Sequence, residues 1–349
     1  MTSYYIMYLI PSLMALISIR EKTKNNKTIW LLIGILFTFL IGYRFEVGGD
    51  WVVYLGRLDD NQYSTLREIL EGKDPGYYLI NYFMHLMDWG IYGVNLICGA
   101  IFMMGLIIFA RKQYSPWLAF SVAIPYLIVV VGMGYTRQAV AIGLVFWAIV
   151  ALNDKKFFWF LILVTLAATF HKSAVLMIGI GMFGQGTGKL LRVLAIGFVG
   201  FGIYDAFLSE HQEALWKNYV EAQMESQGAK VRVLMNLVPA LLFFVFRKEW
   251  KALYDDYGFW RIIAVGSIAS IFIVDYASTA VDRVALYMIP IQLVVFGRLP
   301  LLAKKYLVPK NTTLLVVLYY AFVLFVWLNF ATHAEYWLPY QNYLFYDLF

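Results

Sequence analysis

The chain has 349 residues, of which 62% are hydrophobic and only 14% are charged. Soluble domains carry about a quarter of charged residues, so this composition excludes that class and indicates an integral membrane protein. The chain has one cysteine, Cys98, which excludes a disulfide framework within it.

Long apolar runs without strict alternation predict membrane-spanning helices rather than a β-barrel. The first run, Tyr4–Ile19, has no basic region before it and no small-residue cleavage site after it, so we interpret it as a retained span. We therefore expect an all-α, polytopic transmembrane helical bundle that forms a single domain over residues 1–349. Hydropathy places twelve spans at about residues 3–19, 29–43, 91–110, 116–134, 138–152, 157–170, 174–188, 190–208, 230–246, 261–278, 284–299 and 312–330.

The apolar stretch 76–87 is predicted to be a re-entrant or interfacial helix. A second crossing there would place Arg111 and Lys112 outside, against the positive-inside rule. With the amino terminus outside, the inner loops hold 18 of the 28 basic residues and only five of the 22 acidic ones. The net charge of +6 therefore reflects orientation in a membrane, and we expect no nucleic-acid partner.

The second apolar run ends at Arg44, which opens a polar segment that also contains Glu46, Asp50 and Tyr54. Charge at the mouth of a span is costly and usually marks a functional site. Asp50 follows Gly48 and Gly49, whose backbone freedom permits a tight turn and close approach of a ligand. Asp50 is therefore a candidate general base or sugar ligand. Alternatively, it pairs with Arg44 or caps the helix that follows.

Further cations lie at the predicted outer boundary, where topology gives no reason for them: Arg137, Lys172, Lys230, Arg232 and Arg283. The planar guanidinium fork matches phosphate oxygens and keeps its charge, so these arginines suit a lipid-linked diphosphate. Taken singly, each could instead reach lipid headgroups or form a structural ion pair. No His or Cys cluster has the spacing of metal ligands, and we expect neither a metal nor a cofactor.

Several spaced motifs, in this order and with this outward placement, resemble the EpsG and Wzy family of bacterial polysaccharide polymerases. They are Tyr43, Arg44, Val47, Gly48, Asp50 and Tyr54; Pro75, Gly76 and Tyr77; Tyr135, Arg137 and Gln138; His171, Lys172, Ser173 and Ala174; and Asp282, Arg283 and Tyr287.

The resemblance implies a metal-independent glycosyltransferase of GT-C-like architecture in the cytoplasmic (inner) membrane. Such an enzyme would transfer a glycan from undecaprenyl diphosphate to a hydroxyl of another lipid-linked repeat unit at the outer face, with membrane lipids and a chain-length regulator of the Wzz type as further partners. The residues expected to bind diphosphate are Arg137 and Arg283 first, Arg44 and Arg232 next, and Lys172. Asp50, Glu46 and His171 are the expected general bases. The expected sugar ligands are Tyr54, Tyr135, Gln138, Tyr287 and Asp282.

Two alternatives share this membrane class. An O-antigen ligase would transfer the glycan to a lipid A core, and a flippase would carry the lipid-linked oligosaccharide across the membrane. A transporter should hold charge near the bilayer midplane, whereas the candidates here gather at outer ends of spans. Two outer loops lie near the expected site, 44–75 and 209–229, and the second is either an amphipathic lid or a solvated connector.

Overall fold

The computed structural model describes residues 1–17, 26–61, 64–184, 197, 228–276 and 278–348. Within these ranges every regular element is a helix, which confirms the all-α prediction for the described part of the chain. The helices are α1 (Thr2–Ile17), α2 (Lys27–Gly42), α3 (Trp51–Asn61), α4 (Leu66–Glu71), α5 (Pro75–Leu86), α6 (Gly90–Arg111), α7 (Pro116–Ala123), the π-helix η1 (Ile124–Gly132), α8 (Thr136–Asn153), α9 (Phe157–Ala168), η2 (Lys172–Val175), α10 (Leu176–Gly184), α13 (Ala229–Val245), α14 (Arg247–Leu253), α15 (Tyr257–Ile273), α16 (Ser278–Met288), α17 (Pro290–Leu302), α18 (Pro309–Phe330), η4 (Ala334–Trp337) and η5 (Tyr343–Leu348).

Four stretches in the described part are long and apolar enough to cross a membrane: Gly90–Arg111, Thr136–Asn153, Ser278–Leu302 and Pro309–Phe330. A fifth exists if α13 and α14, bent by 74°, count as one span. The other apolar helices are shorter than a straight crossing of about 20 residues needs. The prediction of twelve spans is therefore met only in part. The span predicted at 190–208 and nearly all of the loop 209–229 lie outside the described residues.

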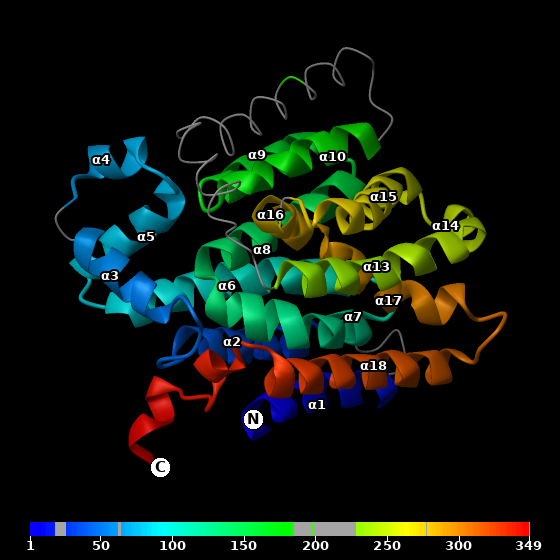
Figure 1. Ribbon diagram of the computed structural model, residues 1–349, viewed down its shortest axis with the longest axis horizontal. Coiled ribbons are helices and arrows are strands. Elements are labelled where there is room, and N and C mark those ends of the chain that lie inside the picture. The colour runs from blue at the N-terminus through cyan, green and yellow to red at the C-terminus, as the bar shows by residue number, and fades with distance from the viewer. Residues whose placement is uncertain (18–25, 62–63, 185–196, 198–227, 277, 349) are drawn as a thin grey trace.

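The long helices run roughly along one axis of the molecule, as Figure 1 shows. α6 packs against α2, α5, α7 and α8. The α6 and α8 backbones touch at two glycines, because a Cβ on Gly105 would lie 1.8 Å from the Gly143 carbonyl oxygen. Small residues allow such close packing where lipid offers no hydrophobic driving force between helices. The centre of the bundle is thereby fixed by backbone contact.

Ion pairs among the described residues lie at two ends of this bundle. At one end, Lys112 pairs with Asp154 at 2.9 Å, and Arg298 pairs with Asp256. All four belong to loops or helix ends predicted to be inner. At the other end Lys230 pairs with Asp275, which connects two predicted outer segments. The contacts thus agree with the predicted division of loops between two faces.

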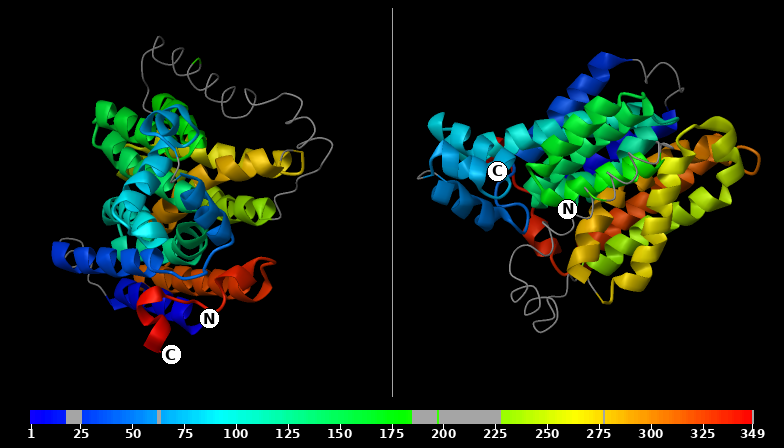
Figure 2. Two further views of the ribbon diagram at one scale, coloured as in Figure 1. Left: turned by 90° about the vertical axis from the view of Figure 1, so that its left-hand side faces the viewer. Right: turned by 90° about the horizontal axis from the view of Figure 1, so that it is seen from above.

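The predicted re-entrant or interfacial stretch 76–87 forms α5, a helix of 12 residues. It packs against α3, α4 and α6. These short helices form a cluster at one end of the bundle, visible in Figure 1 and in the right-hand view of Figure 2. Pro75 stands in the first turn of α5, where the missing amide N–H costs nothing.

Residues 331–348, here called the C-terminal segment, fold back onto the amino-terminal half. The amide of Phe45 donates to the Gln341 carbonyl at 3.1 Å, and the amide of Gly48 donates to the Tyr336 carbonyl at 2.8 Å. The Tyr4 hydroxyl donates to the Trp337 carbonyl at 2.7 Å. The two ends of the chain consequently lie near each other, as marked in Figure 1.

Candidate functional site

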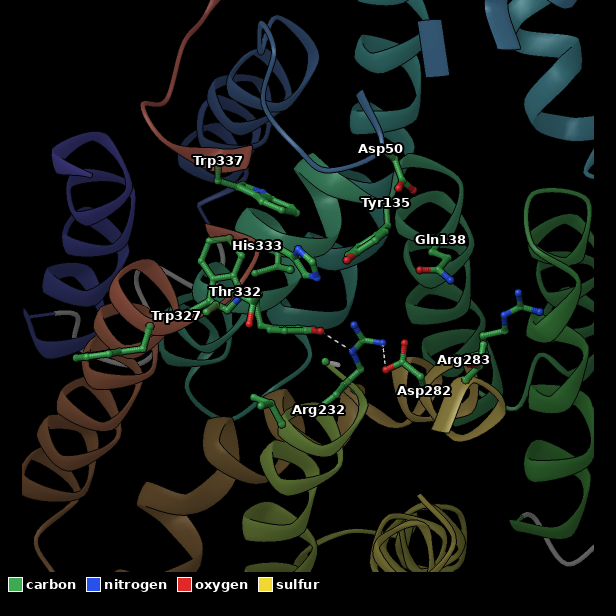
Figure 3. Close-up of a pocket in the computed structure, with 17 residues that line it drawn as sticks. Asp50, Tyr135, Gln138, Arg232, Asp282, Arg283, Trp327, Thr332, His333 and Trp337 are labelled. Atoms are coloured by element: carbon green, nitrogen blue, oxygen red, sulfur yellow. Dashed lines mark hydrogen bonds and ion pairs between the residues drawn. The ribbon is translucent and has the colours of Figure 1, made fainter. Parts of the chain in front are cut away.

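A cavity of about 690 Å³ opens at the end of the bundle that carries α3 and the C-terminal segment. That volume is in the usual range for small-molecule sites. Segments far apart in the sequence line it, as the close-up in Figure 3 shows. Its lining residues are Asp50, Tyr126, Val130, Tyr135, Gln138, Gly228, Val231, Arg232, Thr279, Asp282, Arg283, Trp327, Phe330, Ala331, Thr332, His333 and Trp337.

Asp50 reaches the cavity from the turn between α2 and α3. Gly48 adopts φ +106° in this turn, and a Cβ there would lie 2.3 Å from the Met133 carbonyl oxygen. A side chain is therefore excluded both by conformation and by space. Burial raises the pKa of the Asp50 carboxyl, although the charges of Arg137 and Arg57 oppose that shift. A carboxylate with a raised pKa is better matched to proton transfer near neutral pH than an ordinary one.

Arg232, in the first turns of α13, is the cation at the centre of the cavity. Its side chain is buried, its Nε donates to the Tyr126 hydroxyl, and its Nη1 pairs with the Asp282 carboxylate. The guanidinium also lies over the Tyr126 ring, 5.5 Å from its centroid. Figure 3 shows the pair with Asp282 crossing from α13 to α16. These contacts hold the guanidinium in one orientation before any ligand arrives.

Tyr126 reaches Arg232 from the π-helix η1. Pro125, at the start of η1, has no amide N–H and so cannot continue the α-helical hydrogen-bond pattern of α7. Wide helical turns of this kind recur at functional sites, because they change the direction in which side chains project. Tyr126 was not predicted as a site residue, since it stands inside an uninterrupted apolar run.

Arg283 is the second cation in the lining. Its side chain extends from α16 away from the Arg232–Asp282 pair in Figure 3. Among the described residues, no hydrogen bond and no ion pair involves its guanidinium, which lines the cavity. The cavity therefore offers guanidinium groups on two sides rather than at one point.

Aromatic rings form one wall of the cavity, here called the aromatic wall. The Trp337 indole N–H donates to the Val129 carbonyl at 2.8 Å. Its ring lies edge-on to Trp327, with centroids 5.0 Å apart, and 6.5 Å from the ring of Tyr135. Such faces bind the apolar side of sugar rings, while Tyr135 and Gln138 add polar groups. Trp327, Trp337 and His333 were not predicted as site residues, because nothing local in the sequence links the C-terminal segment to Asp50 or Arg232.

Gln138 is held by a half-buried histidine that does not itself line the cavity. Its Nε2 donates to Nε2 of His171 at 3.1 Å, and Nδ1 of His171 lies 3.1 Å from the Tyr287 hydroxyl. Because Nε2 accepts, the ring proton belongs on Nδ1 and is donated to Tyr287. Burial, with the nearby charges of Arg283 and Arg137, lowers the pKa of His171 to about 3. His171 is thus neutral and occupied at both nitrogens, whereas the Gln138 side-chain oxygen lies on the Tyr135 side in Figure 3.

Arg137 lies behind the cavity lining and forms an ion pair with Asp74, at the start of α5. The Tyr54 hydroxyl lies 3.5 Å from the Arg137 amide nitrogen. Burial raises the pKa of Asp74 against the opposing charge of Arg137, and Lys172 is also among the cations that act on this carboxyl. Arg137, Lys172 and Tyr54 therefore form a layer next to the cavity without lining it. Asp74 was not predicted as part of this layer.

Arg44, which was predicted to bind diphosphate, does not line the cavity. The side chain is 1% exposed, and each of its three guanidinium nitrogens already donates within the protein. The acceptors include the Asn95 side chain on α6 and the Thr136 hydroxyl on α8, at 3.1 and 2.9 Å. Arg44 thus joins the Asp50 turn to α6 and α8 and does not pair with Asp50. Glu46 is exposed with φ +51° and does not line the cavity.

Six of the thirteen predicted site residues line the cavity: Asp50, Tyr135, Gln138, Arg232, Asp282 and Arg283. Two carboxyl groups and two guanidinium groups balance there, and no group of three or more metal-ligand side chains occurs among the described residues. A family model described as the EpsG family matches residues 27–342. No curated protein and no solved structure matches the chain.

Proposed function

The chain belongs to the EpsG family, membrane proteins of the polysaccharide-polymerase type, and on that premise we propose that it joins oligosaccharide repeat units carried on a polyprenyl diphosphate, expected to be undecaprenyl diphosphate. One observation carries the proposal. Asp50, Arg232 and Arg283, from three distant segments, line a single cavity that faces an aromatic wall. This combination provides a proton acceptor, anion ligands and a sugar-binding surface in one place.

The reaction needs charge stabilisation at the leaving group. When the bond between the anomeric carbon and the phosphate oxygen breaks, its electron pair stays on the diphosphate. Arg232, fixed by Tyr126 and Asp282, is placed to stabilise that charge without reorganising, and its Nη2 makes no hydrogen bond within the described ranges. Arg283 supplies the second cation. Asp282 balances the charge of Arg232 until a diphosphate competes for it.

The reaction also needs a base for the acceptor. As the acceptor hydroxyl oxygen bonds to the anomeric carbon, its proton passes to the Asp50 carboxylate. Gln138 accepts a hydrogen bond from a sugar hydroxyl, and Tyr135 and Trp337 bind the ring face. His171 and Tyr287 act through Gln138 and are positioning residues. Arg44 keeps the Asp50 turn in place rather than binding diphosphate.

The test uses purified protein in liposomes with polyprenyl-diphosphate-linked repeat units as both donor and acceptor. A ladder of products longer than one unit, formed with EDTA present, is the expected result. If units are transferred once to a lipid A core acceptor and no ladder forms, the protein is a ligase. Movement of the lipid-linked unit across the bilayer without a new glycosidic bond would identify a flippase. A matched preparation with Asp50→Asn controls for contaminating enzymes.

A further inference from the structure

Part of the cavity lining is both apolar and exposed, and we call this part the mouth of the cavity. Two of its lining residues, Val231 on α13 and Phe330 on α18, are 54% and 72% exposed. Both are apolar and stand at the ends of α13 and α18 that meet the cavity, whereas the charged lining of Arg232 and Asp282 lies inside. The mouth is therefore apolar at its rim and polar within.

α17 lies between the two helices that form this mouth, since it packs against both α13 and α18. From the mouth, exposed apolar side chains continue along α13 at positions 231, 234 and 238, which share one helix face. On α18 they continue at 330, 326 and 322. An apolar surface thus leads from the cavity into the depth of the span.

A charged cavity that opens toward hydrocarbon is costly to leave unoccupied, because its ions lose solvation there. A ligand with an anionic head and a long hydrocarbon chain removes this cost. The head would contact Arg232 and Arg283, and the chain would leave past Val231 and Phe330. A fully water-soluble sugar donor would gain nothing from an apolar rim.

We propose, building on the function proposed above, that the isoprenoid chain of the polyprenyl diphosphate exits between the start of α13 and the end of α18. The substrate then enters sideways from the membrane through a portal formed by Val231, Trp327 and Phe330. Trp327 is the part of the portal that also touches the aromatic wall, through its ring contact with Trp337. In this arrangement the isoprenoid chain lies on the side of the portal, and the glycan lies on the side of Asp50.

A matched pair of phenylalanines allows a sharp test. Phe330 is 72% exposed at the end of α18, and Phe272 is 73% exposed near the end of α15 but does not line the cavity. Phe330→Glu and Phe272→Glu therefore place the same charge at similar exposure. We expect Phe330→Glu to raise KM at least tenfold for units on a long polyprenyl diphosphate and less than threefold for units on a short, water-soluble prenyl diphosphate. Phe272→Glu should change neither.

A second measurement does not depend on catalysis. A polyprenyl diphosphate with a diazirine on the isoprene next to the phosphate is photolysed with the wild-type protein in liposomes, and adducts are mapped by mass spectrometry. We expect adducts at the start of α13 and the end of α18, reduced by unlabelled polyprenyl diphosphate. A diazirine-bearing phosphatidylcholine, in contrast, should label exposed positions such as Phe272 as strongly as the portal positions.

The outcomes separate the two proposals. Adducts spread evenly over the lipid-facing helices, or equal effects of Phe330→Glu and Phe272→Glu on KM, overturn the portal. Portal adducts without a product ladder would overturn the polymerase function and keep the portal. A product ladder without adducts at the portal would overturn the portal and keep the polymerase function.

Discussion

Arg232 allows the clearest separation of catalysis from stability, because the chain contains a matched arginine. Arg232 and Arg298 are each 5% exposed, and each forms an ion pair with an aspartate and lies over aromatic rings. Arg232 lines the cavity, while Arg298 lies at the opposite end of the bundle, where it contacts Asp256 and Gln113. We compare Arg232→Gln with Arg298→Gln.

Both substitutions leave a buried carboxylate without its cation. Asp256 has a side chain only 10% exposed, so the loss should approach the 3–5 kcal/mol typical of breaking a buried pair, reduced by its two indole N–H donors. Asp282 is 17% exposed and can be hydrated from the cavity, so about 1–3 kcal/mol is expected. Arg298→Gln should therefore destabilise the protein more.

The order should reverse for catalysis. Removing one preorganised donor from a developing anion costs about 10²–10³ in kcat, and only Arg232 is in the cavity. We expect that loss for Arg232→Gln and a kcat within about threefold of wild type for folded Arg298→Gln. Thermal unfolding in detergent gives stability, and the initial rate of ladder formation gives kcat. The double variant Arg232→Gln, Asp282→Asn should regain stability without regaining activity. An Arg232→Gln protein that polymerises at more than a third of the wild-type rate refutes this reasoning.

Three further predictions follow from the site. Asp50→Asn should lower kcat about 10²–10⁴-fold; because burial raises the Asp50 pKa, wild-type activity should fall with decreasing pH sooner than for an ordinary carboxylate, and a pH–rate profile unchanged in the variant contradicts a base role. The pKa of His171 is about 3 in the folded protein and 6.5 in the unfolded chain, so the unfolded chain binds the proton first as the pH falls. The free energy of unfolding of the wild type should therefore decrease by about 2 kcal/mol from pH 7 to pH 5. Thermal unfolding of His171→Gln should show a smaller decrease over the same pH range. Gly48→Ala should cost about 1–3 kcal/mol and most activity, because it adds strain at φ +106°, whereas Gly49→Ala, whose Cβ meets no atom nearer than 3.9 Å, should be tolerated; equal loss in both would exclude the turn geometry as the cause.

The site could be predicted from the sequence only where local patterns carry it. Asp50 was predicted because its glycines mark a turn at the end of an apolar run, and it does line the cavity. Arg232 and Arg283 were predicted because they stand at the predicted outer boundary of spans, and both line the cavity. Arg44 also stands at the predicted outer boundary, yet its guanidinium donates its hydrogen bonds to Asn95, Thr136 and backbone carbonyls. A boundary position alone does not distinguish these cases, since it depends only on hydropathy.

The partners of these residues had no local signal. Tyr126 and Arg232 are 106 positions apart, and Tyr126 stands in an apolar run whose π-helical turns decide where its hydroxyl points. Trp337 joins the site only because the C-terminal segment folds back onto the Asp50 turn. His171 was predicted as a base, and the structure instead gives it hydrogen bonds to Gln138 and Tyr287 that leave neither nitrogen free.

The sequence by itself determined that this is a helical membrane protein, because hydropathy along the chain sets the cost of placing each segment in lipid or water. It also indicated the family. Only the tertiary structure decided which boundary cations enter the cavity and which are used to hold helices together. That choice depends on where distant helices bring acceptors such as Asp282 and Asn95, and helix packing is not encoded in any short stretch of the chain.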